Sequence, residues 1–84
     1  MINLNYDRKF DVLYIALVDE EYRKNSLADE EYNGLVVMRN EYTEEATGLI
    51  IFGFKEKYNK NKFPILPADV KINMEQDIFP NIIL

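Results

Sequence analysis

Apolar and polar side chains alternate along four segments of the chain with the spacing of β-strands. Residues 2–6 alternate with a period of two, which predicts a strand with one buried face. Residues 11–18, 34–40 and 47–54 are apolar on both faces of such a strand and rich in β-branched and aromatic residues. The pattern predicts an antiparallel meander of four strands, roughly at these positions, in a small β-rich α+β domain.

The strands at 11–18 and 47–54 are expected at the centre of the sheet, covered on both sides, because both of their faces are apolar. In the first of them, Tyr14 lies mid-strand and is expected in the core. The C-terminal segment is the expected cover of one face of the sheet. A second subunit is the expected cover of the other, since small domains without disulfides often gain stability by dimerising. We therefore expect a homodimer.

Two polar segments interrupt this pattern. Residues 19–33 carry six acids, and their large hydrophobes, Tyr22, Leu27 and Tyr32, are spaced by five, which matches neither a helix nor a strand. We interpret this segment as a long loop, with an edge strand or a helical turn as alternatives. Residues 55–62 (KEKYNKNK) predict a solvated, lysine-rich loop.

The C-terminal part predicts a short helix after a proline-bracketed segment. Pro64 and Pro67 exclude a helix interior between them, because proline lacks the N–H that a helix requires. Further on, Asn73 is a suitable N-cap for residues 74–79, with Gln76 at the capping-box position. This helix is expected to pack on one face of the sheet. The whole chain, 1–84, is thus predicted to be a single domain.

Composition excludes several kinds of chemistry. The 84 residues contain no Cys and no His, so disulfides, zinc–thiolate sites and Ser-His triads are ruled out. The only serine, Ser26, has no histidine to activate it. The N-terminal residues lack the pattern of a signal peptide, and the longest apolar run, 12–18, is far shorter than the roughly 20 residues that span a bilayer. We expect a cytoplasmic protein without a membrane segment or a cofactor.

The formal charge of −5 is unevenly distributed. Residues 1–54 hold eleven acids against five bases, whereas residues 55–84 hold four acids against five lysines. Nucleic-acid binding needs a basic surface that displaces counterions from phosphates, so direct binding to nucleic acid is not expected. An acidic surface instead suits a basic protein partner, although many soluble proteins are acidic without such a partner.

Four short stretches, at residues 6–7, 11–17, 33–37 and 47–51, resemble the small β-sheet family catalogued as domain of unknown function 2283. The resemblance covers residues 2–54 and implies a small antiparallel sheet. It implies no catalytic residues. Some members of that family lie beside small toxin-like partners, which implies an antitoxin-like role. The chain departs from the family pattern in the long stretch 19–33 and in residues 63–84.

The acidic loops and their tyrosines are the candidate interaction residues. Tyrosine is frequent at interfaces because it combines a rigid apolar ring with a polar hydroxyl, although these tyrosines are equally suited to anchoring loops on the sheet. The acids have no spacing typical of a calcium loop, so we expect no metal site. The predicted partner-binding residues are Asp19, Glu20, Glu21, Tyr22, Asp29, Glu30, Glu31, Tyr32, Glu41, Tyr42, Glu44 and Glu45.

These observations favour a non-enzymatic protein that binds and neutralises a basic protein such as a toxin or a nuclease. In electrostatic terms, its carboxylates would occupy a groove that normally binds phosphates. Two alternatives remain at the level of the sequence. One is a small carboxylate- or metal-dependent enzyme that uses acids of the loops, and the other is a structural homodimer module.

Overall fold

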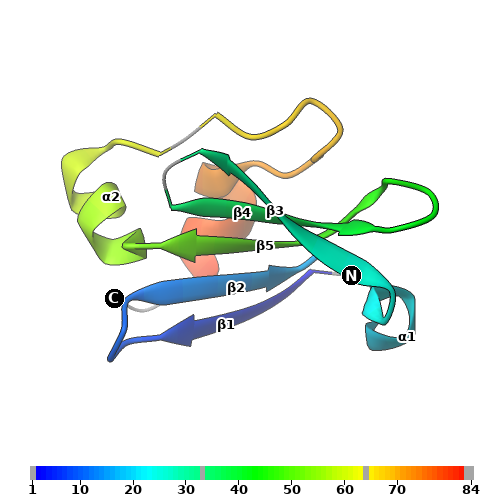
Figure 1. Ribbon diagram of the computed structural model, residues 1–84. Coiled ribbons are helices and arrows are strands. Elements are labelled where there is room, and N and C mark those ends of the chain that lie inside the picture. The colour runs from blue at the N-terminus through cyan, green and yellow to red at the C-terminus, as the bar shows by residue number, and fades with distance from the viewer. Residues whose placement is uncertain (1, 33, 64, 83–84) are drawn as a thin grey trace.

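A computed structural model describes residues 2–32, 34–63 and 65–82 and contains one five-stranded antiparallel sheet (Figure 1). Its strands are β1 (Asn3–Asp7), β2 (Val12–Ala16), β3 (Ser26–Tyr32), β4 (Leu35–Asn40) and β5 (Ala46–Phe52). Their order across the sheet is β1-β2-β5-β4-β3. The expected small α+β domain with an antiparallel sheet is confirmed. The four-strand meander is wrong, both in the number of strands and in their order.

The additional strand, β3, lies at the edge of the sheet and pairs only with β4. The long loop predicted for residues 19–33 is therefore wrong; the segment holds the short helix α1 (Glu20–Arg23) and then β3, so both alternatives occur together. Side chains of β3 such as Leu27 are exposed. Because this strand is held by backbone pairing and not by burial, it has no hydrophobic alternation that could reveal it.

The order of the strands differs from a meander because β5 lies between β2 and β4. Ile51 of β5 lies opposite Leu13 of β2 on one side and opposite Leu35 of β4 on the other. All three side chains are fully buried. The central position of β5 buries its apolar residues on the covered face more completely than an edge position would.

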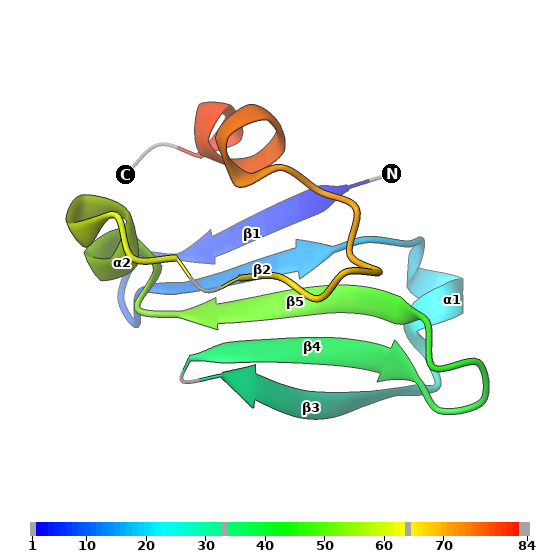
Figure 2. The same cartoon turned by 90° about the horizontal axis from the view of Figure 1, so that it is seen from above.

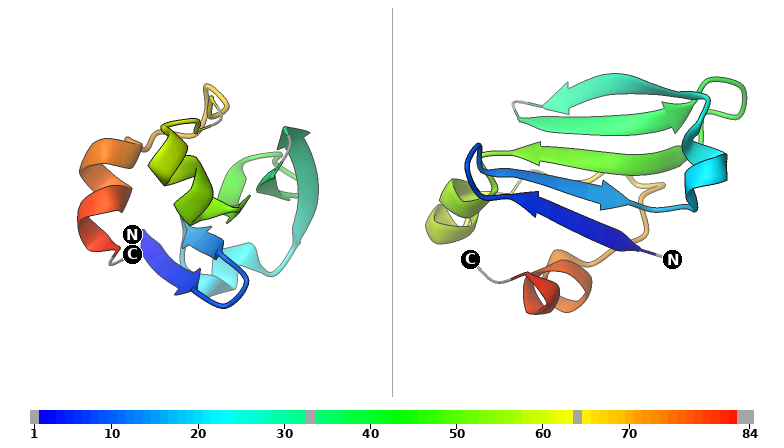
Figure 3. Two further views of the ribbon diagram at one scale, coloured as in Figure 1. Left: turned by 90° about the vertical axis from the view of Figure 1, so that its left-hand side faces the viewer. Right: turned by 90° about the horizontal axis from the view of Figure 1, so that it is seen from below.

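One face of the sheet is covered by α2 (Phe54–Lys60) and by the C-terminal segment, as Figure 2 and the left view of Figure 3 show. The predicted cover of one face by the C-terminal segment is confirmed, because Val70 and Ile78 from that segment belong to the buried core. Pro64, one of the prolines used in that prediction, lies outside the described residues. The buried core consists of Leu13, Ile15, Leu35, Val37, Leu49, Ile51, Phe54, Val70 and Ile78.

Phe54 lies at the centre of an aromatic cluster on the covered face and is fully buried. Its ring centroid is 5.7 Å from that of Tyr6, 6.5 Å from Tyr58, 5.5 Å from Phe63 and 6.2 Å from Phe79. The cluster joins β1, α2 and the C-terminal segment. Burial of large aromatic rings contributes strongly to the stability of a small domain.

The lysine-rich loop predicted at 55–62 is also wrong, because most of it forms α2. Phe54 and Tyr58, four residues apart, put two aromatic rings on the same face of this helix, against the core. Gly53 precedes the helix with φ of +67°, a backbone conformation that residues with a Cβ rarely adopt. Asn61 ends it in the left-handed conformation, and its N–H donates to the carbonyls of Lys57 and Tyr58.

The N-terminus of α2 is capped by Asp11, a residue 44 positions earlier in the chain. Its carboxylate accepts hydrogen bonds from the backbone N–H of Lys55 (2.7 Å) and Glu56 (3.4 Å) and from the hydroxyl of Tyr6 (2.5 Å). Burial, this hydrogen bond and the negative charge of Asp11 together raise the pKa of Tyr6 to about 12. Burial alone would raise the pKa of Asp11, but the three hydrogen bonds outweigh it and lower that pKa.

The predicted helix after Asn73 is present as a five-residue π-helical turn, η1 (Met74–Ile78), followed by a 3-10 turn, η2 (Phe79–Asn81). The Asn73 side chain accepts a hydrogen bond from the N–H of Gln76 (3.0 Å), as expected of an N-cap. The reciprocal bond of the capping box comes from Asp77, not Gln76, since the Asp77 carboxylate accepts from the Asn73 N–H (2.8 Å). The longest helix of the described chain is α2, not this C-terminal one.

We expect the substitution Asn73→Ala to lower the free energy of unfolding by about 1 kcal/mol, because it removes the acceptor for the Gln76 N–H. Asn73→Asp is the control, since it keeps an acceptor oxygen at the same position. Urea unfolding followed by circular dichroism measures both changes. Equal midpoints for Asn73→Ala and the wild type would show that the cap contributes nothing.

Candidate functional site

Two of the predicted acidic segments lie at the same end of the sheet, where β2 and β4 end and β5 begins (Figures 1 and 2). One is α1 with Asp19 before it; the other is the turn between β4 and β5. The backbone N–H of Glu41 in this turn donates to the carbonyl of Asn25, just after α1, at 2.8 Å. We call this surface the acidic end; it comprises Asp19, Glu20, Glu21, Tyr22, Glu41, Tyr42, Glu44 and Glu45.

The turn from Asn40 to Glu45 is held in a defined shape. The Asn40 side chain accepts hydrogen bonds from the N–H of Tyr42 (2.8 Å) and of Thr43 (3.0 Å). Arg39 donates to the carbonyl of Glu44, which has a positive φ of 64°. The turn therefore presents its carboxylates on a fixed backbone, which lowers the entropy that a partner must remove on binding.

Both described tyrosines of the acidic end are exposed. Tyr22 in α1 is 62% exposed and Tyr42 in the β4–β5 turn is 76% exposed. They do not anchor their loops on the core. Each offers a large apolar ring to the outside among carboxylates, which is the composition of a polar interface with aromatic contacts.

The third acidic segment lies along the edge strand β3 and is not part of the acidic end. Asp29 and Glu30 are exposed there. Glu31 forms an ion pair with Arg39, with 3.7 Å between Nη2 and Oε1. Arg39 also forms two hydrogen bonds to Asp69, at 2.6 and 3.2 Å, which raise the pKa of Arg39 and tie the C-terminal segment to β4. The side chain of Tyr32 lies outside the described part of the structure.

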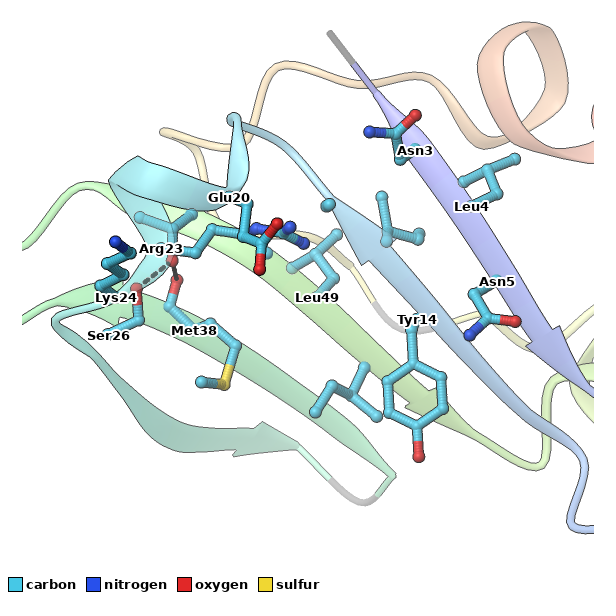
Figure 4. Close-up of a pocket in the computed structure, with 15 residues that line it drawn as sticks. Asn3, Leu4, Asn5, Tyr14, Glu20, Arg23, Lys24, Ser26, Met38 and Leu49 are labelled. Carbon is cyan, nitrogen blue, oxygen red and sulfur yellow. Dashed lines mark hydrogen bonds between the residues drawn. The ribbon is translucent and has the colours of Figure 1, made fainter.

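On the face of the sheet opposite α2, apolar side chains of β2, β4 and β5 are partly exposed, and α1 lies against one end of this face (Figure 4). Tyr14, expected in the core, is 43% exposed on this face, and Phe52 is 45% exposed. Tyr14 lies directly opposite Ile50, and Ile50 lies opposite Val36, so the three side chains form a row across three strands. We call this surface the open face; it consists of Tyr14, Val36, Met38, Ile50 and Phe52.

A groove of about 580 Å³ runs along the open face toward α1. Tyr14, Met38 and Ile50 line its apolar part, and Arg23 of α1 lies at its end, as Figure 4 shows for the labelled residues. The Nε atom of Arg23 is buried and has no hydrogen-bond partner. Among residues 2–32, 34–63 and 65–82, Arg23 also forms no ion pair. The sequence signal for this surface was the apolar character of both faces of β2 and β5.

Within residues 2–32, 34–63 and 65–82, no group of three or more carboxylates lies close enough to hold a metal ion. Ser26 donates to or accepts from the Thr47 hydroxyl at 2.7 Å, a contact between two strands that positions Thr47 toward the Met38 carbonyl. Among the same residues, no helix has the length and apolar character needed to cross a bilayer.

The fold and the two surfaces define a small α+β protein with one open apolar sheet face and one acidic end. Comparisons with protein-family models, with curated proteins and with solved structures found no match to this chain. The resemblance of residues 2–54 to domain of unknown function 2283 therefore remains a prediction. The functional argument rests on the surfaces themselves.

Proposed function

We propose that this chain is a non-enzymatic interaction protein that binds a basic protein partner through the acidic end and so neutralises it. The observation that carries the proposal is the placement of α1 and the β4–β5 turn, 20 residues apart in the chain, at one end of the sheet. Six carboxylates and two exposed tyrosines are thereby gathered on one surface. A partner with lysines and arginines in a nucleic-acid-binding groove has the complementary charge.

The resemblance to domain of unknown function 2283 supports the same proposal, because some members of that family lie beside small toxin-like partners. The residues that carry the resemblance are not at the acidic end. Tyr6 and Asp11 form the cap of α2, and the remaining matched positions are mainly strand residues and turns. The family-like part is therefore the scaffold in this proposal, and the acidic segments determine which partner binds.

Reversing charges at the acidic end is expected to abolish partner binding. The test variant is Glu21→Lys with Glu45→Lys; both residues are exposed and lie on the two segments of the acidic end. The matched control is Glu56→Lys with Glu75→Lys, also exposed but on α2 and η1. Each pair changes the net charge by the same amount. We expect the test pair to lose at least about tenfold in affinity, because like charges facing each other across an interface cost several kcal/mol.

The experiment immobilises the wild type and both variants, passes native lysate over each, and identifies stoichiometrically bound proteins by mass spectrometry at low and high salt. We expect one basic protein on the wild type and on the control, released by salt and absent from the test variant. Recovery of no stoichiometric basic protein on the wild type, or equal recovery on the test variant, would contradict the proposal.

A further inference from the structure

The groove on the open face is a hollow that the sequence of the central strands creates. Side chains on this face come from alternate residues, and Ala16 of β2, Gly48 of β5 and Met38 of β4 lie next to one another in register. Ala16 and Gly48 carry little or no side chain. In the neighbouring row, Tyr14 and Ile50 carry large ones. The floor of the groove is therefore low beside α1, and larger apolar side chains bound it farther along the strands.

The groove has the size and the lining of a small-molecule site. Its volume of about 580 Å³ lies within the range of about 300–1,000 Å³ that is usual for ligand pockets. Such pockets are mostly apolar and contain a few polar groups that orient the ligand. Here Tyr14, Met38 and Ile50 form the apolar part, and α1 places charged side chains at one end.

Arg23 of α1 is the group at that end whose hydrogen-bonding capacity is unused. Its Nε atom is buried without a hydrogen-bond partner. In the part of the chain that the structure describes, its guanidinium forms no hydrogen bond or ion pair at all. A guanidinium has five N–H donors in one plane and keeps its charge, and a donor shut off from water without an acceptor is costly. A ligand that brings an acceptor removes this cost.

The charges that line the groove favour a single negative charge on the ligand. Arg23 and Lys24 are cations, and Glu20 is the one acid among the described residues of the lining. Asp19 and Glu21 do not line the groove, but they adjoin Glu20 in the chain and repel further negative charge. The lining therefore balances a monoanion, whereas a group with two negative charges meets repulsion.

We propose that the open face binds a small amphipathic carboxylate, with its apolar body against Tyr14, Met38 and Ile50 and its carboxylate on the guanidinium of Arg23. Figure 4 shows the side chain of Arg23 extending from α1 over the strands that line the groove. Two N–H groups of a guanidinium match the two oxygens of a carboxylate in one plane. Because part of Arg23 is already out of water, this pair loses less hydration when it forms than a pair on a fully solvated arginine.

The proposed ligand site is separate from the proposed partner binding. Of the described residues at the acidic end, Glu20 is the one that also lines the groove. The charge reversals at Glu21 and Glu45 leave the groove unchanged, and the variants below leave the acidic end unchanged. The two proposals can therefore fail separately.

Isothermal titration calorimetry with octanoate, an eight-carbon carboxylate without other functional groups, tests the ligand site. We expect saturable binding of one octanoate per chain, and binding about fourfold tighter for each CH₂ added up to decanoate, the effect of burying one methylene. Octan-1-ol and octylamine have the same tail with a neutral or a positive head. Both are expected to bind the wild type at least about tenfold more weakly than octanoate, since neither makes a charge-assisted hydrogen bond to Arg23.

Four variants separate the recognition of the head from that of the tail. Arg23→Gln is expected to weaken octanoate about tenfold and to leave octan-1-ol within about twofold, because only the charged head loses its partner. Lys9→Gln is its control, since it removes the same charge in the β1–β2 turn, outside the groove. Ile50→Gln is expected to weaken both ligands. Its control is Phe52→Gln, on the same face but outside the lining, which is expected to weaken neither. Circular dichroism confirms that each variant is folded.

A wild type that shows no saturable octanoate binding up to about 10 mM would overturn the proposal. Equal affinities for octanoate and octan-1-ol, or an unchanged octanoate affinity in folded Arg23→Gln, would also overturn it, because Arg23 would then not recognise the head. Tighter binding of octyl phosphate than of octanoate would assign the groove to phosphates instead. A loss for octanoate alone in Arg23→Gln, with Lys9→Gln unchanged, supports the carboxylate site.

Discussion

Replacing Phe54 with alanine is expected to remove most of the stability of the protein at room temperature. Phe54 is fully buried and touches four other aromatic rings, from β1, α2 and the C-terminal segment. Removal of a buried phenylalanine ring costs about 3–5 kcal/mol, from lost burial and from the cavity left behind. A domain of this size has a total stability near the lower end of about 5–15 kcal/mol.

The control for this prediction is Phe10→Ala. Phe10 is the same residue type but 69% exposed in the turn between β1 and β2, so its removal is expected to cost less than about 1 kcal/mol. Urea unfolding, followed by circular dichroism, compares the three proteins under identical conditions. Similar midpoints for Phe54→Ala and Phe10→Ala would show that the aromatic cluster does not hold the C-terminal segment on the sheet.

Replacing Asp11 with alanine is expected to lower the free energy of unfolding by about 2–4 kcal/mol, because two effects add. The backbone N–H groups of Lys55 and Glu56 lose their acceptor at the start of α2. In addition, Asp11 has a φ of 54°, a left-handed conformation that is strained for alanine. Asp11→Asn separates these effects, since asparagine tolerates this conformation and keeps one acceptor oxygen. We expect it to cost about half as much, and equal costs would show that the backbone strain is negligible.

The same contacts predict how stability depends on pH. The pKa of Asp11 is lowered in the folded protein, so its contribution to stability is present above about pH 3.9, the usual pKa of Asp, and lost as the pH falls through the lowered value. The pKa of Tyr6 is raised to about 12, so its contribution is present below about pH 10 and lost as the pH rises from there to about 12.

Tyr6→Phe tests the alkaline part of this prediction, because it keeps the ring against Phe54 and removes only the hydroxyl. Thermal unfolding at several pH values from 8 to 12 measures the effect. We expect the variant to be less stable than the wild type at pH 8 and this difference to shrink toward pH 12. A constant difference over that range would contradict the raised pKa.

The four strands predicted from the hydrophobic pattern are all present because burial determines them, and burial leaves a periodic pattern in the sequence. The elements that the pattern missed are held by other forces. β3 is held by backbone pairing with β4, and the side chains of residues 27–31 in it are exposed. α2 is capped by Asp11 from far away in the chain, so the segment 55–62 resembles a polar loop. The central position of β5 was expected from its two apolar faces, but its place between β2 and β4 was not, since a strand's sequence does not state which strands it pairs with.

The candidate site was predictable in composition but not in arrangement. The exposure of Tyr22 and Tyr42 agrees with their position among acids, whereas the meeting of α1 and the β4–β5 turn follows from the strand order. Glu31 is not free for a partner, because Arg39 engages it. The sequence does suggest that two apolar faces need two covers. It could not indicate that Tyr14 would be among the residues left exposed.

The position of β5 also has a consequence for how the chain folds. β1 with β2, and β3 with β4, are pairs of neighbours in sequence that form early by closing short loops. These two hairpins are joined in the sheet only by β5, which is the last strand to leave the ribosome. A nascent chain that ends before Ala46 therefore holds two hairpins with unpaired apolar edges and no common core. We expect folding to be delayed until β5 and α2 are complete, and then to occur in one cooperative step.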